Sequence, residues 1–222
     1  MNLSLAYLNQ DYYQNYPLIQ ALERGFEVVR EDESGVLLTD DYPTYALLST
    51  TEPLKFLNLI PKPEVMFVVG EKAGSLAQSH FGFDNAMSCH QYYYPFQTIE
   101  SDLVLEQATL DDLAFIAQHY TLANEDELRE TIDAGHLWVM RDMGQILGFI
   151  GRHPEGSMGM MEVLPDYRRK GWGERLERAL IKIVLAAGEL PYGHVVIGNE
   201  ASARLQEKLG MVRCKEIVTW LW

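Results

Sequence analysis

One segment, residues 163–173, constrains the fold more than any other part of this 222-residue chain. It begins as an apolar stretch that suits a strand, stops at Pro165, and enters a helix through a turn containing Gly171 and Gly173. Glycines let backbone N–H groups approach an anion closely. The free N–H groups and partial positive charge of a helix start favour phosphate. The segment therefore predicts a site for a phosphate or pyrophosphate group.

The same turn concentrates basic side chains in a chain that is otherwise acidic. The formal net charge is −14, from 32 acidic and 18 basic side chains. Even so, Arg168, Arg169 and Lys170 are consecutive, and Trp172 lies between the two glycines. Cationic side chains strengthen the binding of an anion. A basic strand–helix turn without a ligand is the alternative interpretation.

The acidic balance argues against partners that are themselves anionic. Nucleic-acid-binding proteins usually present a basic face, so we expect no nucleic acid partner and no membrane surface. No apolar run reaches the ~18 residues that a membrane-spanning helix needs, and no export signal is evident. With only Cys89 and Cys214 in the chain, we expect reduced thiols, a cytoplasmic location and no metal site.

The C-terminal half predicts a mixed α/β sheet with the order β-α-α-β-β-β-α-β-α-β. Thr109 and Asn124 are N-cap residues for two helices, and the sequence Asp142-Met143-Gly144 suits a hairpin turn. The expected ranges are strand 103–107, helices 109–120 and 124–135, strands 136–141, 145–151 and 157–164, helix 172–187, strand 194–197, helix 200–209 and strand 211–222.

The N-terminal half repeats part of this order. We expect strands over 27–30, 36–39 and 45–48, helix 51–59, strand 65–69, helix 74–81 and strand 88–94. Gly70 stands 12 residues before Gly82, as Gly198 stands 12 before Gly210. Internal duplication with a degenerate first copy explains this spacing, and chance similarity is the alternative. We expect domains over residues 1–98 and 99–222.

The glycine turn resembles the signature of the GNAT superfamily of N-acetyltransferases, which is Arg/Gln-x-x-Gly-x-Gly/Ala after a core strand. Arg168, Gly171 and Gly173 match it, and the resemblance extends over about residues 101–222. It implies a GNAT-like fold with acetyl-CoA as co-substrate and no metal. It also implies that the turn binds the CoA pyrophosphate, while the backbone of Met161 and Val163 pairs with pantetheine.

A second segment, residues 199–211, is similar to the family motif Asn-x-x-Ala-x-x-Leu-Tyr-Glu-Lys-Leu-Gly-Phe. The likeness implies CoA contacts from Asn199, Ser202 and Gln206. Within the superfamily, residues 164–169 and Pro191-Tyr192 look most similar to the glycine N-acyltransferase branch. Members of that branch carry an N-terminal domain shaped like half of the catalytic one. The corresponding turn here, residues 48–53, has no glycine and contains Glu52, so we expect no CoA in the N-terminal domain.

Two departures from the family pattern concern catalysis. The tyrosine that commonly protonates the leaving CoA thiolate is replaced by Gln206, which is no general acid. Where several members hold a catalytic glutamate, this chain has Ser157, which can position water but is a poor base.

Three other residues are candidates for the base that deprotonates an ammonium acceptor. His194 lies on the strand before Asn199, and an unperturbed histidine pKa near 6.5 suits proton removal. Glu155 could act through a water held by Ser157. Glu162, in mid-strand, either faces the substrate or forms a salt bridge. Structural roles for all three are the alternative.

These features predict direct transfer of an acyl group, acetyl first among the candidates, from acyl-CoA to a primary amine in a ternary complex. Proximity lowers the barrier, and the backbone N–H of Val163 is the best candidate to stabilise the oxyanion. One alternative is a non-catalytic CoA-binding module, which Gln206 and Ser157 favour. Another is an enzyme that acetylates a protein. We expect a monomer or a homodimer.

Overall fold

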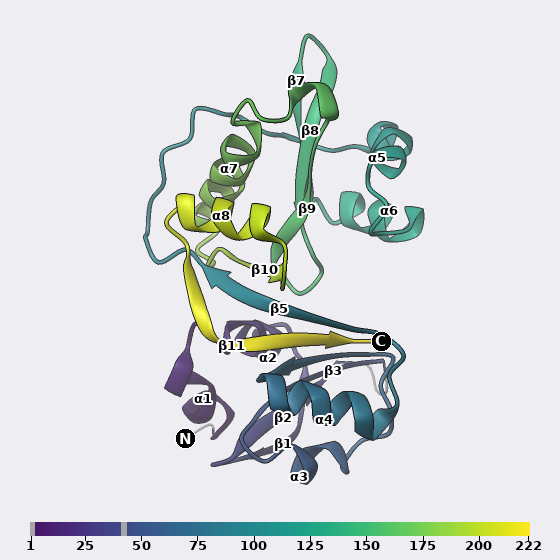
Figure 1. The fold of residues 1–222 in the computed structure, drawn as a ribbon, viewed down its shortest axis with the longest axis vertical. Coiled ribbons are helices and arrows are strands. Elements are labelled where there is room, and N and C mark those ends of the chain that lie inside the picture. The colour runs from purple at the N-terminus through teal and green to yellow at the C-terminus, as the bar shows by residue number, and fades with distance from the viewer. Residues whose placement is uncertain (1–2, 41–43) are drawn as a thin grey trace. The chain divides into compact units, whose positions relative to one another are not determined.

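The computed structural model describes residues 3–40 and 44–222, and the chain divides into two compact units (Figure 1). Unit 1 comprises Met1–Gln91, Val195–Glu200 and Arg213–Trp222. Unit 2 comprises Tyr92–His194 and Ala201–Val212. Both units combine helices with parallel and antiparallel strand pairs, so the predicted α/β fold with a mixed sheet is confirmed.

Unit 1 has the strand order β1-β2-β3-β4-β11-β5. Strands β1 to β3 are antiparallel, and β3 and β4 are parallel. Its elements are α1 (Leu3–Leu8), the short 3-10 helix η1 (Asn9–Asp11), α2 (Tyr16–Glu23), β1 (Glu27–Asp32), β2 (Gly35–Thr39), β3 (Tyr45–Thr50), α3 (Pro53–Leu57), β4 (Val65–Val69), α4 (Glu71–Phe81), most of β5 (Ala86–Tyr93) and most of β11 (Val212–Leu221).

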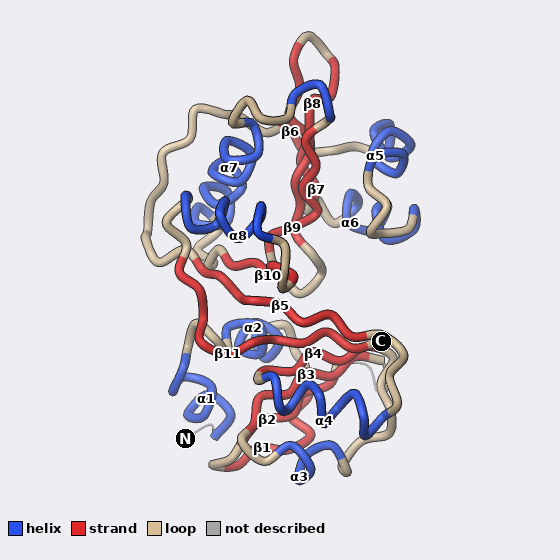
Figure 2. The backbone as a smooth tube through the Cα atoms, viewed as in Figure 1, coloured by secondary structure: helices blue, strands red, loops and turns tan. Residues whose placement is uncertain are grey.

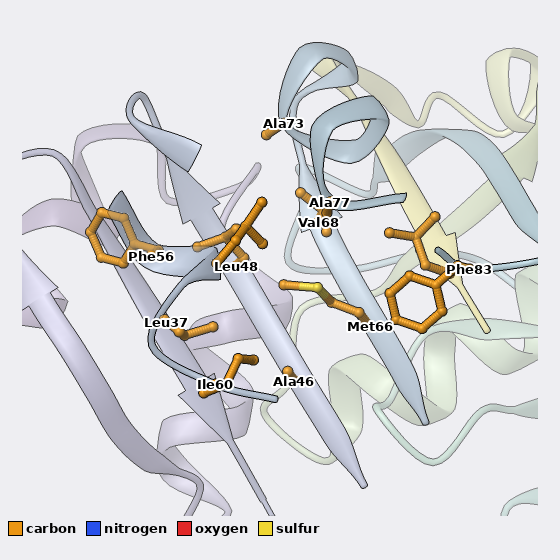
Figure 3. Packing of buried hydrophobic residues seen from close by; sticks show 12 residues of the cluster. Leu37, Ala46, Leu48, Phe56, Ile60, Met66, Val68, Ala73, Ala77 and Phe83 are labelled. Atoms are coloured by element: carbon orange, nitrogen blue, oxygen red, sulfur yellow. The ribbon is translucent and has the colours of Figure 1, made fainter. Parts of the chain in front are cut away.

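Two apolar cores form on opposite faces of this sheet. Leu37 and Leu48 belong to the core that includes residues of α3 and α4 (Figure 3), whereas Leu38 and Leu47 belong to the core that includes residues of α1 and α2. Successive side chains of a strand point to opposite faces. The continuous apolar runs in β2 and β3 are therefore buried on both sides.

The sequence analysis missed α1 and α2. Six consecutive residues of α2, from Tyr16 to Ala21, are buried, so its sequence lacks the polar face that marks an amphipathic helix. Asn15 makes no side-chain cap hydrogen bond to α2. Pro17 in the first turn is a weak local signal, and packing against the sheet supplies most of the stability of this helix.

Unit 2 has the strand order β10-β9-β8-β7-β6, with α5 and α6 on one side of the sheet and α7 and α8 on the other (Figure 2). Its elements are β6 (Glu106–Gln107), the 3-10 helix η2 (Leu110–Asp112), α5 (Leu113–His119), α6 (Glu125–Asp133), β7 (Leu137–Asp142), β8 (Gln145–Arg152), β9 (Met158–Val163), the 3-10 helix η3 (Pro165–Tyr167), α7 (Trp172–Ala186), β10 (Tyr192–Val196) and α8 (Glu200–Lys208).

Local sequence signals account for most element boundaries of unit 2. Thr109 and Asn124 both form capping boxes, as their positions predicted. Met143 and Gly144 have φ values of 46° and 81°, which suit the two-residue hairpin turn between β7 and β8.

The strand predicted over residues 103–107 is shorter in the structure, where only Glu106–Gln107 forms a strand. Val104 is 86% exposed, so this segment buries no apolar face and only β6 forms.

The last strand of the chain belongs to unit 1. β11 pairs antiparallel with β4, from Val218 opposite Val69 to Leu221 opposite Met66. The sequence analysis expected this strand in the domain over residues 99–222. The compact units change at residue 91 rather than at residue 98, and unit 1 takes its β11 from the other half of the sequence.

The two halves of the chain share one order of elements. Three antiparallel strands, a helix, a strand, a helix and a strand occur as β1 to β5 with α3 and α4, and again as β7 to β11 with α7 and α8. The equal glycine spacing has a structural counterpart, because Gly70, Gly82, Gly198 and Gly210 all have positive φ, from 64° to 98°.

Candidate functional site

Strand β9 has one edge that is largely unpaired. Between β9 and β10, Gly193 and Met158 form the only aligned parallel pair among the described residues. A Cβ atom at Gly193 would lie 3.0 Å from the carbonyl oxygen of Met158, so glycine permits this close approach. Beyond this pair, residues 159–163 pair with β8 only. We call their other side the open edge.

The backbone of Met161 and Val163 faces the open edge. On the side of β9 that faces β8, the backbone N–H of Leu164 donates to the carbonyl oxygen of Leu147 at 3.0 Å. Hydrogen-bonding directions alternate along a strand, so the polar groups of Val163 point away from β8, as do those of Met161. Consistent with this direction, the carbonyl of Val163 accepts a hydrogen bond from Arg168 Nε at 2.8 Å. These are the two residues that the sequence analysis assigned to pantetheine.

A bulge bends β9 next to the open edge. Between the pairs Phe149–Glu162 and Gly151–Gly159, β9 has one residue more than β8. Met160 lies within this bulge and has a φ of 49°, which is uncommon for a residue with a side chain. The bulge turns the strand and accompanies the end of its pairing with β10.

The turn after β9, residues 168–173, forms the expected helix start, and we call it the phosphate turn. Gly171 is the N-cap of the 15-residue α7 and has a φ of 82°. A Cβ atom at Gly171 would meet no other atom within 4 Å, so the space in front of the turn is open. A Cβ atom at Gly173 would lie 3.9 Å from both Met161 Cε and Leu205 Cδ2. The turn, the open edge and α8 therefore converge at Gly173.

The cations of the phosphate turn have internal partners. Arg168 forms an ion pair with Glu162 at 2.6 Å, and its side chain is 55% exposed. Lys170 donates to the carbonyl of Asp166 at 2.8 Å and lies over the ring of Tyr167. Arg169 is exposed and has a φ of 60°. Exposed ion pairs contribute at most about 1 kcal/mol, so a phosphate could displace these partners.

Arg175 adds a cation to the first turns of α7 that the sequence analysis did not single out. It lies 4.1 Å from the ring centroid of Trp172 and forms an ion pair with Asp102 at 3.0 Å. Its spacing of three residues from Trp172 on a helix was the available signal.

Glu162 is salt-bridged, which decides between the two alternatives that its sequence position left open. Its carboxylate also raises the pKa of Tyr120, after the larger effect of burial on that phenol. Tyr120 follows α5, so Glu162 faces the α5–α6 side of the sheet, opposite to Met161. The pairing with Arg168 does not favour Glu162 as a free base.

His194 is the first residue of β10 after its pair with β9. Burial lowers the pKa of its imidazole to about 3, and the charge of His153 acts in the same direction. The ring of Tyr192 meets it edge-on at 5.7 Å. The sequence analysis used the unperturbed value near 6.5, and desolvation of the imidazole accounts for the difference. His194 is neutral at physiological pH.

Glu155 and Ser157 lie together next to β9. The buried Ser157 hydroxyl donates directly to the Glu155 carboxylate. Tyr192 donates its hydroxyl proton to the Glu155 carbonyl at 2.8 Å. Glu155, Ser157, Tyr192 and His194 therefore form one polar group on unit 2.

His153 belongs to this group and was missed. The backbone N–H of His153 donates to the backbone carbonyl of Ser157 at 2.9 Å. A Cβ atom at Gly159 would lie 2.4 Å from His153 Nε2, so the imidazole covers Gly159 at the start of the open edge. The connection between β8 and β9 places His153 over Gly159, and no sequence motif indicated this position.

The second predicted motif lies mainly on α8. The Gln206 side chain is buried and donates to Glu177 of α7 at 2.7 Å. Ser202 is half-buried on the same helix. Asn199, whose backbone N–H donates to Val196, lies in a segment of unit 1. Glu177 was not anticipated, because a glutamate in a helix is usually exposed.

The described residues form neither a metal-binding cluster nor a membrane-spanning helix. Residues 3–40 and 44–222 contain no group of three or more histidine, cysteine, aspartate or glutamate side chains arranged to hold a metal ion. In the same residues, every helix is too short or too polar to cross a membrane.

Comparisons with known proteins identify the fold. The family described as FR47-like protein matches residues 138–220, which run from β7 into β11 and contain the open edge and the phosphate turn. No curated protein matched the sequence.

Solved structures share the fold at low identity. A Drosophila protein from a structural genomics programme has a TM-score of 0.60 at 15% identity, over 95% of this chain and 87% of that chain. A GNAT-family acetyltransferase from Colwellia psychrerythraea has a TM-score of 0.55 at 15% identity, over 99% and 97%. A tandem GNAT protein from the clavulanic acid biosynthesis pathway has a TM-score of 0.50 at 13% identity, over 94% of this chain and 87% of that chain. The predicted GNAT-like fold is confirmed, and the tandem protein supports a layout of two domains.

Gly171→Asp and Gly171→Asn test the phosphate turn as a matched pair. Both side chains meet the same backbone strain at a φ of 82°, but only aspartate adds a charge to the open space before α7. Unit charges at 4 Å repel by about 1 to 4 kcal/mol, so we expect Gly171→Asp to bind acetyl-CoA about 10-fold or more weakly than Gly171→Asn. Titration calorimetry measures both affinities, and thermal unfolding verifies that both variants fold. Equal affinities would contradict the assignment.

The lowered pKa of His194 predicts a dependence of stability on pH. Below pH 6.5 the unfolded chain takes up a proton that the folded imidazole refuses down to about pH 3. The free energy of unfolding should therefore decrease as the pH is lowered below 6.5, by up to about 1.4 kcal/mol per pH unit. Chemical denaturation of wild type and His194→Gln between pH 7 and 5 should give a shallower slope for the variant. Identical slopes would mean that the imidazole is solvated.

Proposed function

We propose that this chain, which has the fold of GNAT acetyltransferases, transfers an acyl group from acyl-CoA to a primary amine. The observation that carries the proposal is the open edge of β9 next to the phosphate turn. The edge offers the backbone of Met161 and the N–H of Val163 to an amide-containing arm, while Arg168 holds the Val163 carbonyl. The helix start offers N–H groups to a diphosphate. Acyl-CoA has both chemical features, because its amide-containing pantetheine arm is joined directly to its diphosphate.

The residues present fit acetyl-CoA on these points. The backbone of Met161 and Val163 would pair with pantetheine, and the space at Gly173 would admit it beside α8. The N–H groups of residues 171–173, with Arg168, Arg169 and Lys170, would hold the pyrophosphate. When bound, acetyl-CoA supplies the activated acyl group as a thioester. The backbone N–H of Val163 is the candidate donor to the oxyanion.

Proton removal from the amine would use the polar group beside β9. His194 is neutral at physiological pH and can accept a hydrogen bond, but an imidazole whose pKa is about 3 holds a proton poorly. We therefore propose that the amine lies against His194 and that its proton passes to His153 or to Glu155, which Ser157 orients. Glu162 pairs with Arg168 until a diphosphate competes for that cation, and it does not belong to this polar group.

The described residues of the N-terminal unit form neither feature of this site. β3 and β4 pair in parallel over five residues, from Tyr45–Val65 to Ser49–Val69, so no comparable open edge forms there. The five-residue α3 begins after Glu52 and not after a glycine. These differences support an N-terminal domain that is a degenerate, half-GNAT-like copy, as in the glycine N-acyltransferase branch.

Stoichiometry tests this asymmetry. We expect titration calorimetry to give one acetyl-CoA per chain, because among the described strands only β9 has an open edge next to a glycine turn. Gly171→Asp should lower affinity without exposing a second binding event. A stoichiometry near two would contradict the proposal that the N-terminal unit binds no CoA.

Turnover tests the proposed reaction. The purified chain with acetyl-CoA and a panel of alkylamines, amino acids, polyamines and peptides with a free N-terminus should release CoA thiol, detected with a chromogenic disulfide. Release should require one class of amine and should weaken in Gly171→Asp. Acetyl-CoA binding without amine-dependent release would instead favour a non-catalytic CoA-binding module. Copurification of one protein that becomes acetylated would favour a protein substrate.

A further inference from the structure

A buried carboxyl group and a buried amide face each other between α7 and α8. Glu177 is 5% exposed and Gln206 is 7% exposed. Gln206 Nε2 donates to Glu177 Oε1 at 2.7 Å. Glu177 Oε2 and Gln206 Oε1 are both buried and have no hydrogen-bond partner among the described residues. We call these two residues the acid–amide pair.

One proton on Glu177 would satisfy both unpaired atoms. A neutral carboxyl group carries an O–H donor, and the free Gln206 oxygen is an acceptor. The pair would then hold two hydrogen bonds in place of one, with no buried charge. Burial raises the pKa of Glu177 to about 7, against a smaller opposite effect of the Gln206 hydrogen bond. Geometry and desolvation both favour the protonated form below neutral pH.

The charged side chains on α7 and on the elements packed against it have other partners or are exposed. Glu174 pairs with Arg178 and Lys208, and on the far side of β9 Glu162 pairs with Arg168. Arg152 of β8 pairs with Glu189, and Arg175 pairs with Asp102. The remaining charged residues of α7 and α8 are exposed; they are Lys182, Glu200, Arg204 and Glu207. Desolvation, rather than a neighbouring charge, governs Glu177.

The acid–amide pair adjoins the place where the turn, β9 and α8 converge. Glu177 lies four residues after Gly173, so the two share one face of α7. Gln206 follows Leu205, whose Cδ2 is 3.9 Å from the position of a Cβ at Gly173. Met161 of the open edge is equally near that position. A ligand arm that passed from the phosphate turn along β9 would therefore run beside this pair.

We propose that Glu177 donates the proton that the departing CoA sulfur takes up, and that Gln206 positions the carboxyl group for this transfer. The inference rests on the proposed acyl transfer. As the amine nitrogen bonds to the acyl carbon, it gives its surplus proton to His153 or Glu155, and the carbon–sulfur bond breaks with its electron pair going to sulfur. The Glu177 O–H proton then bonds to sulfur, which leaves a carboxylate that accepts the Gln206 N–H. Water reprotonates Glu177 before the next cycle.

Glu177→Gln is the first test, because an amide is isosteric and can pair with Gln206 through two hydrogen bonds. Infrared spectra of the chain without CoA should show the carbonyl stretch of an un-ionised carboxyl group at pH 6. That band should disappear in Glu177→Gln and titrate near pH 7 in the wild type. Glu207→Gln, an exposed position next to Gln206, is the control that should keep the band. Its absence from the wild type at pH 6 would overturn the inference.

Kinetics with acetyl-CoA and the amine panel test the proton transfer itself. We expect Glu177→Gln to lower kcat about 10²–10⁴-fold, the usual loss for a general acid, with acetyl-CoA affinity unchanged. Wild-type kcat should fall above pH 7 as Glu177 ionises, and this limb should be absent from the variant. Gln206→Met should raise the pH at which the band titrates. Normal turnover by Glu177→Gln would overturn the donor role.

The two proposals fail separately. A chain that binds no acetyl-CoA, or that binds it and acylates no amine, contradicts the proposed function whatever the infrared band shows. A chain that acylates an amine while Glu177 is ionised at pH 6 contradicts only the inference about Glu177.

Discussion

The candidate site depends on the end of parallel pairing between β9 and β10. Hydrogen bonding holds the strands together at Gly193 and Met158, where the missing Cβ permits close approach. The bulge at Met160 then turns β9, and its next residues keep only β8 as a partner. Unpaired backbone groups at a strand edge are strong hydrogen-bonding groups that require a partner. In this fold they form the edge along which an amide-containing ligand can lie.

Desolvation has opposite effects on two buried titratable groups of unit 2. It lowers the pKa of His194 and raises the pKa of Glu177, and in both cases the neutral form is favoured. The cations of the phosphate turn remain at the surface, where a diphosphate would replace their weak internal pairs. The basic side chains of the candidate site thus lie at the phosphate turn, whereas desolvation keeps His194 and Glu177 in their neutral forms.

The two halves of the chain show how the same element order can keep or lose such a site. In unit 1, five aligned pairs join β3 to β4, and Glu52 precedes a helix of only five residues. In unit 2, one aligned pair precedes a glycine N-cap and a helix of 15 residues. Element order alone therefore does not create the site, because strand register and the residue at the helix start decide whether backbone groups remain free.

Local signals in the sequence determined most of the secondary structure and the phosphate turn, because caps, glycine turns and hairpins act within a few residues. Thr109, Asn124 and Gly171 all stand where their chemistry predicted. Burial and long-range pairing act between residues far apart in the chain, and only the tertiary structure decided them. It buried α2 from Tyr16 to Ala21, assigned β11 to unit 1, and brought Glu177 against Gln206. It also left His194 half-buried on β10, where desolvation lowers the pKa of its imidazole.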